Sequence, residues 1–392
     1  RLGNFTFQST FQQDNRRENR IRRMNHSDIP TVSLHLKSLQ NSLIWNKGYG
    51  QWKSEAGGQL LLTDNHNERG TGVVPIIPNY TEVAFGVYAL QKLTANRWGM
   101  EAGVRLDGQQ TKADGYDWTG NRYGGTRDFT NFTYSLGGHY HINKQLKLTS
   151  HFGVAWRAPH VYELYSNGNE LSSGIFVKGD STLLSEQSYK WISSLKYTSK
   201  YFDVQLDGYL QWINNYIFDQ PTGRNITVIS GAYPVFQYRQ TRAFFQGVDL
   251  DAHVRPVSSL DYHLVTAMIW AREMPSHAYL PYIPSFRLTH SLTWSLPFFK
   301  AFSPKLGLTH RFVAKQTRFN PATDLIANSP EAYHLMGFDV SFSVPMREGQ
   351  SLRVGLMGDN ILNREYKEYT NRSRYYAHDM GRDVRCMITW NF

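Results

Sequence analysis

Two segments of the chain combine closely spaced arginines with histidine or tyrosine side chains. The first comprises Arg16, Arg17, Arg20, Arg22, Arg23 and His26, and the second comprises Tyr369, Arg372, Arg374, Tyr375, Tyr376 and His378. Guanidinium groups bind carboxylates and phosphates in a bidentate manner, and aromatic rings add stacking surface. The composition therefore predicts that both segments bind an anionic ligand. The alternatives are contacts with phosphate groups at a membrane surface, or loops that are simply solvated.

Other chemistries find little support in the sequence. The chain contains no Gly-x-Ser-x-Gly, His-Glu-x-x-His or glycine-rich phosphate-binding motif, so we predict that it is not an enzyme and has no intrinsic cofactor. Its one cysteine, Cys386, excludes an internal disulfide and a cysteine-rich metal site. The formal net charge is +10, but no nucleic-acid motif surrounds the basic residues, and we predict no nucleic-acid partner.

The segments that must position these residues show period-2 alternation. In residues 100–107, apolar side chains alternate with charged or small ones, and the pattern recurs in 202–212, 248–255 and 383–392. Successive side chains of a strand point to opposite faces, so one face of each segment carries charge and the other carries almost none. The segments run for about 10 to 14 residues, longer than most soluble strands and long enough to cross a bilayer at a tilt.

The connections between the predicted strands alternate in length. We predict about sixteen strands, at residues 4–15, 30–46, 51–66, 81–95, 97–112, 128–142, 145–157, 187–199, 201–217, 235–255, 259–272, 284–297, 303–318, 334–346, 351–366 and 382–392. Short turns such as 256–258 alternate with long loops such as 158–186 and 366–381. Short periplasmic turns and longer extracellular loops alternate in this way in transmembrane β-barrels.

Composition supports the same architecture. The mean hydropathy is −0.49, and no apolar run approaches the roughly 20 residues of a spanning helix. Yet the chain contains 22 Phe, 24 Tyr and 10 Trp. A polar average with many aromatic residues is expected of a barrel with an apolar outside, a polar inside and aromatic belts at both interfaces. We therefore predict an all-β protein of the bacterial outer membrane, a transmembrane antiparallel β-barrel that ends on a closing strand at Phe392.

The end of the seventh predicted strand points to a family. The segment Val154-Ala155-Trp156-Arg157-Ala158-Pro159-His160-Val161-Tyr162-Glu163-Leu164-Tyr165 resembles the aromatic-Arg-Ala-Pro…Glu-Leu-Tyr box of TonB-dependent outer-membrane receptors, carried here by Arg157, Ala158, Pro159, Glu163, Leu164 and Tyr165. Residues 358–366 and 381–392 are similar to that family's Asn-Leu-Phe-Asp-Lys-x-Tyr segment and closing strand. A third family element fits residues 179–186 only at Leu183 and Glu186, because its Asn-Pro is absent.

The resemblance implies that the barrel is larger than the strands counted here. Family members have 22 strands and a plugged lumen, and in them nine strands follow the box, as nine predicted strands follow Pro159. Residues 1–392 would then be the C-terminal portion of one barrel domain, without the plug domain and the first six strands. The chain starts at Arg1 with neither an initiator Met nor a signal peptide, as expected of an internal start.

The resemblance also implies a function. TonB-dependent receptors import scarce, bulky nutrients, and we expect an iron complex here, either a ferric siderophore or haem. Energy would come from a TonB-type complex that acts through the plug. Lipopolysaccharide and a surface lipoprotein are further expected partners. The two arginine-rich segments would bind an anionic iron chelate or the haem propionates.

Histidine is the side chain that a haem or zinc site would require. Residues 161–186 contain none, so His160 is the nearest candidate in that loop, and the identity of any metal stays open. Histidines inside predicted strands are interpreted as lumen or girdle residues: His139, His141, His253, His263, His290 and His310.

Two alternatives to the receptor remain. If the sixteen strands were the whole barrel, the protein would be a passive porin with an open channel. A structural or interaction component of an outer-membrane complex is the other. For the box residues, a purely structural role is also open: Pro159 ends a strand because it has no N–H to donate, and Arg157 pairs with a carboxylate.

Overall fold

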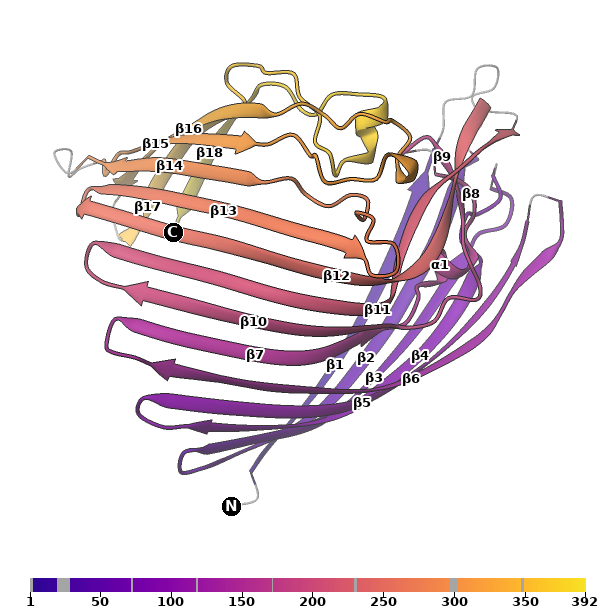
Figure 1. The fold of residues 1–392 in the computed structure, drawn as a ribbon, viewed down its shortest axis with the longest axis horizontal. Helices are drawn as coiled ribbons and strands as arrows, with labels where there is room; N and C mark the ends of the chain where they lie inside the picture. Colours follow the sequence, from indigo (N-terminus) through magenta and orange to yellow (C-terminus); the bar gives the residue numbers. More distant parts are fainter. Residues whose placement is uncertain are drawn as a thin grey trace. The chain divides into compact units, whose positions relative to one another are not determined.

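The computed structural model describes residues 3–19, 29–71, 73–117, 119–170, 172–228, 231–296, 302–346 and 349–392. Among these residues, 18 strands belong to one sheet, and consecutive long strands lie side by side (Figure 1). No helix in the described part of the chain is both long enough and apolar enough to span a membrane.

The strands account for most of the described residues. They are β1 (Asn4–Glu18), β2 (Val32–Tyr49), β3 (Trp52–Asn67), β4 (Asn79–Thr94), β5 (Trp98–Tyr116), β6 (Arg122–His141), β7 (Leu146–Arg157), β8 (Asn167–Glu170), β9 (Ile175–Lys178), β10 (Glu186–Thr198), β11 (Phe202–Val228), β12 (Gly231–Val257), β13 (Leu260–Glu273), β14 (Arg287–Ser295), β15 (Lys305–Val313), β16 (Tyr333–Pro345), β17 (Ser351–Asp359) and β18 (Asp383–Asn391). The helical elements are α1 (Val161–Tyr165) and the 3-10 turns η1 (Pro321–Thr323) and η3 (Arg372–Tyr375).

Antiparallel pairing follows the order of the chain. Strands β2 and β3 pair without a break from Leu34 opposite Asn67 to Tyr49 opposite Trp52. The same consecutive pairing joins β1 to β2, β3 to β4, and β4 to β5. It also joins β13 through β18. In such meanders the short turns bring neighbours in sequence together, so every central backbone group finds a partner.

The two faces of the strands differ as the alternation predicts. In β5, Met100, Val104 and Leu106 keep 50%, 48% and 43% of their surface exposed, whereas Asp107 on the other face is only 8% exposed. The apolar residues thus lie on the outward face and the charged ones on the sheltered face. A soluble sheet has the opposite pattern, and a membrane barrel with a lipid-facing outside has this one.

Contacts between Cα atoms divide the chain into two compact units. The first unit comprises residues 1–139, 151–191 and 212–243, and the second comprises 140–150, 192–211 and 244–392.

All sixteen predicted long strands are present, but several boundaries differ. Strands β8 and β9 form a short hairpin inside the predicted loop 158–186, which raises the number of strands from sixteen to 18. Strands β11 and β12 extend well into the predicted loop 218–234. The predicted strand 351–366 ends at Asp359 because Asn360, at φ +47°, turns the chain and exchanges two hydrogen bonds with Arg364.

Candidate ligand-binding site

The arginine of the Arg-Ala-Pro box is the centre of an ionic cluster in the first unit. Arg157 donates from Nη1 and Nη2 to the carboxylate of Glu163, at 2.6 and 2.9 Å. Its Nε and Nη2 donate to the carboxylate of Glu186, at 2.8 and 2.9 Å. Both bonds of each pair run to one planar carboxylate, which is the geometry in which guanidinium recognition is strongest. Since two protein carboxylates occupy Arg157, the geometry fits the structural reading of this residue.

The same cluster fixes the short helix α1, which follows Pro159. His160 is the N-cap: its Nδ1 accepts a hydrogen bond from the N–H of Tyr162 at 3.1 Å. Glu163 completes the capping box, because its Oε2 accepts from the N–H of His160 at 2.8 Å. Protein atoms around the imidazole lower the pKa of His160, although part of its surface is exposed. His160 is therefore a capping residue, and its Nδ1 is already used.

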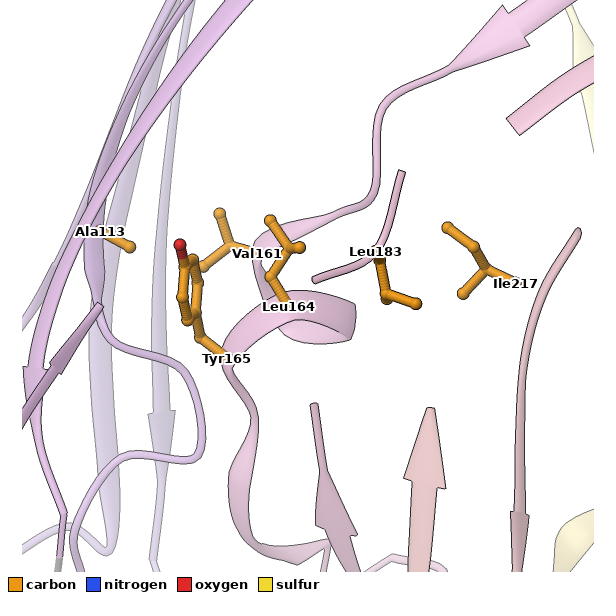
Figure 2. Close-up of a cluster of buried hydrophobic side chains, with 6 residues drawn as sticks. All are labelled: Ala113, Val161, Leu164, Tyr165, Leu183 and Ile217. Carbon is orange, nitrogen blue, oxygen red and sulfur yellow. The ribbon is translucent and has the colours of Figure 1, made fainter. Parts of the chain in front are cut away.

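The buried side of α1 packs into an apolar core of the first unit. Val161, Leu164 and Tyr165 point from the helix toward residues of three other segments (Figure 2). Tyr165 lies beside Ala113 of β5, and Leu164 faces the side where Leu183 lies (Figure 2). The box residues Leu164 and Tyr165 are 2% and 8% exposed, so they serve to anchor the loop that follows the strand.

A hollow of about 740 Å³ lies beside the box. Trp156 Nε1 donates to Oδ2 of Asp107 at 3.0 Å, and Arg105 Nε donates to Oδ1 of the same carboxylate at 2.7 Å. Arg105 also reaches Gln59 Oε1 at 3.2 Å. Other polar side chains line the hollow: Gln40, Glu82, Gln109, Arg157 and His160. With cationic, anionic and amide groups on one wall, the hollow can bind a polar ligand of mixed charge.

The C-terminal arginine-rich segment contains a buried ion pair. Arg374 is 2% exposed, and its guanidinium pairs with Asp324, whose side chain is 3% exposed. The hydroxyl of Tyr375 donates to the other oxygen of Asp324 at 2.7 Å. The guanidinium lies 4.8 and 4.5 Å from the ring centroids of Tyr369 and Tyr375. Arg374, Tyr369 and Tyr375 therefore form a largely buried node that ties two loops together, and ligand binding by these three residues stays a prediction.

Burial also governs the tyrosines of this node. It raises the pKa of Tyr369 to about 12 and raises the pKa of Tyr375. Of the remaining predicted residues in this segment, Arg372 lies 4.9 Å from the ring centroid of Tyr282, whereas Tyr376 and His378 are exposed. The exposed part of the segment is thus smaller and less basic than the sequence predicts.

The N-terminal arginine-rich segment is described only in part. Arg16 and Arg17 lie at the end of β1 rather than in a loop, and Arg16 pairs with Glu18. Arg17 lies 3.5 Å from Glu68 Oε2. Hydrogen bonds from Ser33 and His35 to Glu68 lower the pKa of that carboxyl to about 2. Four predicted residues of this segment lie outside the described residues: Arg20, Arg22, Arg23 and His26.

Sequence reasoning missed the polar wall of the hollow. Arg105 and Asp107 appear in the sequence only as charged members of an alternating strand, and nothing local marks Trp156 as the partner of Asp107, 49 positions away. Asp324 likewise carries no motif. The available signal was their period-2 position on the polar face. This position shows that the side chains face inward, but it does not show which side chains contact one another.

The fold and its exposed apolar face define this chain as a transmembrane β-barrel. The model of the family "TonB dependent receptor-like, beta-barrel" matches residues 1–361, and the chain belongs to this family. Barrels of this family are proteins of the bacterial outer membrane, and the family is one of receptors and transporters rather than enzymes. The resemblance drawn from the Arg-Ala-Pro box is confirmed.

The individual relatives share only 13–20% sequence identity with this chain. The chain is 20% identical over 407 residues to the "TonB-dependent heme receptor A" of Haemophilus influenzae (strain 86-028NP), covering 92% of this chain and 52% of the relative. Among solved structures, the copper transporter OprC superposes with a TM-score of 0.74 at 15% identity, covering 96% of this chain and 60% of OprC. The ferric yersiniabactin uptake receptor FyuA from Yersinia pestis gives 0.64 at 13% identity, covering 97% and 57%. The chain thus spans about half the length of its curated relative.

Proposed function

We propose that this chain is the barrel part of an energy-coupled outer-membrane receptor that imports an iron complex, either a ferric siderophore or haem. The match of the family model over residues 1–361 carries the proposal. The relatives add support, because one is named as a heme receptor and another as a ferric yersiniabactin uptake receptor. Family membership favours the receptor over the passive porin.

The proposal extends to the rest of the protein. Nine long strands, β10 to β18, follow Pro159, as in the family members to which the box is similar. We infer that residues 1–392 are the C-terminal part of a barrel of about 22 strands, which a plug domain closes. The TonB-type complex would act through that plug, and lipopolysaccharide would surround the barrel. A surface lipoprotein is a further proposed partner.

Ligand capture falls to the exposed parts of the two arginine-rich segments. Arg16 and Arg17 keep 64% and 69% of their side-chain surface exposed, and their ion pairs are therefore weak enough to be exchanged for a ligand anion. Tyr376 and His378 provide an aromatic ring and an imidazole on the exposed side of the other segment. The polar hollow beside the box offers a second place for a ligand of mixed charge.

Growth on defined nutrients tests this function. A strain that lacks the gene should fail to grow when a ferric siderophore or haem is the only iron source, and the gene on a plasmid should restore growth. Cobalamin and glycans serve as comparison nutrients for the same strain. Restored growth on one of these but on no iron complex would overturn the assignment to iron. Unchanged growth after deletion of residues 16–29 would refute the role of the N-terminal arginine-rich segment.

A further inference from the structure

A compact group of histidine and aspartate side chains lies in the second unit, far along the sequence from the arginine-rich segments. Asp251 and His253 come from β12, and His263 comes from β13. One ligand atom from each lies within 4.8 Å of the other two. Among the described residues, no other group of three such side chains meets this criterion. We propose that these three residues bind a divalent first-row transition-metal cation on the inner wall of the barrel.

The strand register brings the three side chains to one face. Asp251 and His253 are two residues apart, so both point to the same side of β12, together with Asp249. His263 stacks on His253 with ring centroids 3.9 Å apart and an interplanar angle of 6°. This face of β12 is the polar one, whereas Val248 on the other face is 46% exposed. In a membrane barrel the polar face lines the interior.

The distances suit a metal with nitrogen and oxygen ligands. Asp251 Oδ1 lies 3.0 Å from Nε2 of His263 and 3.9 Å from Nε2 of His253. Bonds of about 2.0–2.2 Å to a central cation place neighbouring ligand atoms somewhat over 3 Å apart, so the observed spacing needs only small shifts. Two imidazoles and one carboxylate form a set that leaves coordination positions open and suits Fe²⁺ and Zn²⁺.

A second layer of contacts orients the proposed ligands. Nδ1 of His253 lies 2.8 Å from Oδ1 of Asp261, and Arg255 Nε donates to Oδ2 of Asp261 at 3.0 Å. A carboxylate at Nδ1 holds the proton there and turns the free lone pair of Nε2 toward Asp251 and His263. Metal-binding histidines are typically held by a carboxylate in this way. Asp261 is thus a positioning residue of the proposed site.

The surroundings favour a cation. A hollow of about 530 Å³ adjoins the site, and four carboxylates line it: Asp203, Asp207, Asp249 and Asp251. Lys196 is the cation that lines the same hollow, at 4.0 Å from Asp203. The surplus of carboxylates raises the local concentration of divalent cations. The site therefore offers a binding step for a bare metal ion, which is distinct from the binding of an iron complex by surface loops.

Three other histidines of the second unit provide a matched control. Nε2 of His290 lies 2.7 Å from Nδ1 of His310, and Nε2 of His310 lies 2.9 Å from Nδ1 of His334. Four of their six ring nitrogens are thus occupied by another histidine of the group. They also point to the apolar face, since Leu292 and Leu308, two residues away in β14 and β15, are 40% and 56% exposed.

The experiment uses the full-length protein purified from outer membranes and treated with a chelator. Zn²⁺ is titrated calorimetrically, and Co²⁺ is followed by its visible absorption. We expect the His253→Gln/His263→Gln variant to lose one equivalent of bound Zn²⁺ and the Co²⁺ band of a nitrogen-ligated ion. His290→Gln/His310→Gln should keep both. Asp261→Asn should weaken binding about 10- to 100-fold.

The outcomes distinguish a metal site from a hydrogen-bonded network that binds no metal ion. Equal Zn²⁺ stoichiometry and affinity in the wild type and in His253→Gln/His263→Gln would overturn the metal site. The same holds if Asp251→Asn and Asp261→Asn both bind Zn²⁺ like the wild type. Each variant is first checked for the heat-dependent shift in gel mobility of a folded barrel. Asp261→Asn keeps all three ligands and so tests the site without removing a ligand.

Discussion

Replacing Arg374 by Met should release two loops of the second unit from each other. The substitution keeps most of the side-chain volume but leaves the carboxylate of Asp324 buried without its cation, at 3% exposure. Removing one partner of a buried ion pair costs about 3–5 kcal/mol. The lost contacts with the rings of Tyr369 and Tyr375 add to this cost.

Hydrogen exchange measured by mass spectrometry reports this change in the free energy of local opening. The N–H groups of Asp324, Arg374 and Tyr376 are hydrogen-bonded within their turns and should be protected in the wild type. In Arg374→Met their exchange should accelerate by about two to four orders of magnitude, up to the rate of the fully open loop. The double variant Arg374→Met/Asp324→Leu should recover most of the protection, because no charge is then left buried.

The control is Arg364→Met, a substitution of an exposed arginine in the same connection, which should leave exchange unchanged. Unaltered protection in Arg374→Met, together with loss of ligand binding, would refute the buried-node account. It would support the prediction that Arg374 contacts the ligand.

Four further predictions concern the first unit. His160→Ala should destabilise the docking of α1 by about 1 kcal/mol, whereas His160→Asn should retain the docked helix because asparagine can also cap it. Equal rates of proteolysis of the two variants would contradict the capping role. Because folding lowers the pKa of His160 from its ordinary value of 6.5, the stability that it provides is complete above pH 6.5 and is lost as the pH falls through the lowered value. The protection factor of the Tyr162 N–H, which corrects for the intrinsic pH dependence of exchange, should therefore fall at acid pH in the wild type and not in His160→Asn. The carboxyl of Glu68 should titrate near pH 2 by NMR. Its contribution to folding stability is therefore complete above pH 4.5 and lost between pH 4.5 and 2. A titration midpoint near 4.5 would contradict the contacts described for this carboxyl. Trp156→Phe should cost about 1–3 kcal/mol in urea unfolding because the buried carboxylate of Asp107 loses a donor; an unchanged midpoint would show that water replaces the indole.

Much of the fold could be predicted from the sequence, because lipid outside and a polar interior impose a strict two-residue period. That period located the sixteen long strands, and their connections set the order of pairing. The hairpin β8–β9 escaped prediction because strands of 4 residues are too short to show a period. The extension of β11 to Val228 and the start of β12 at Gly231 escaped as well, because apolar and polar residues do not alternate strictly in residues 218–234.

The site was harder to predict for a physical reason. The sequence shows which side chains can carry charge. Whether a charged side chain is buried in an ion pair or exposed to a ligand depends on the tertiary structure. Arg374 meets Asp324 across 50 positions, a pairing that no local pattern encodes. The Arg157 pairing could be anticipated, because Glu163 lies only six positions away within the box. His253 and His263 were placed inside strands correctly, but their stacking depends on the register between β12 and β13.

Energy-dependent uptake tests the central proposal most directly. Cells that express the full-length protein are supplied with an iron complex labelled with radioactive iron, in strains with and without a functional TonB complex. The proposal predicts accumulation only when TonB is present, with saturation at low ligand concentration. Uptake that is equal in both strains and rises linearly with concentration would contradict it and identify a passive channel.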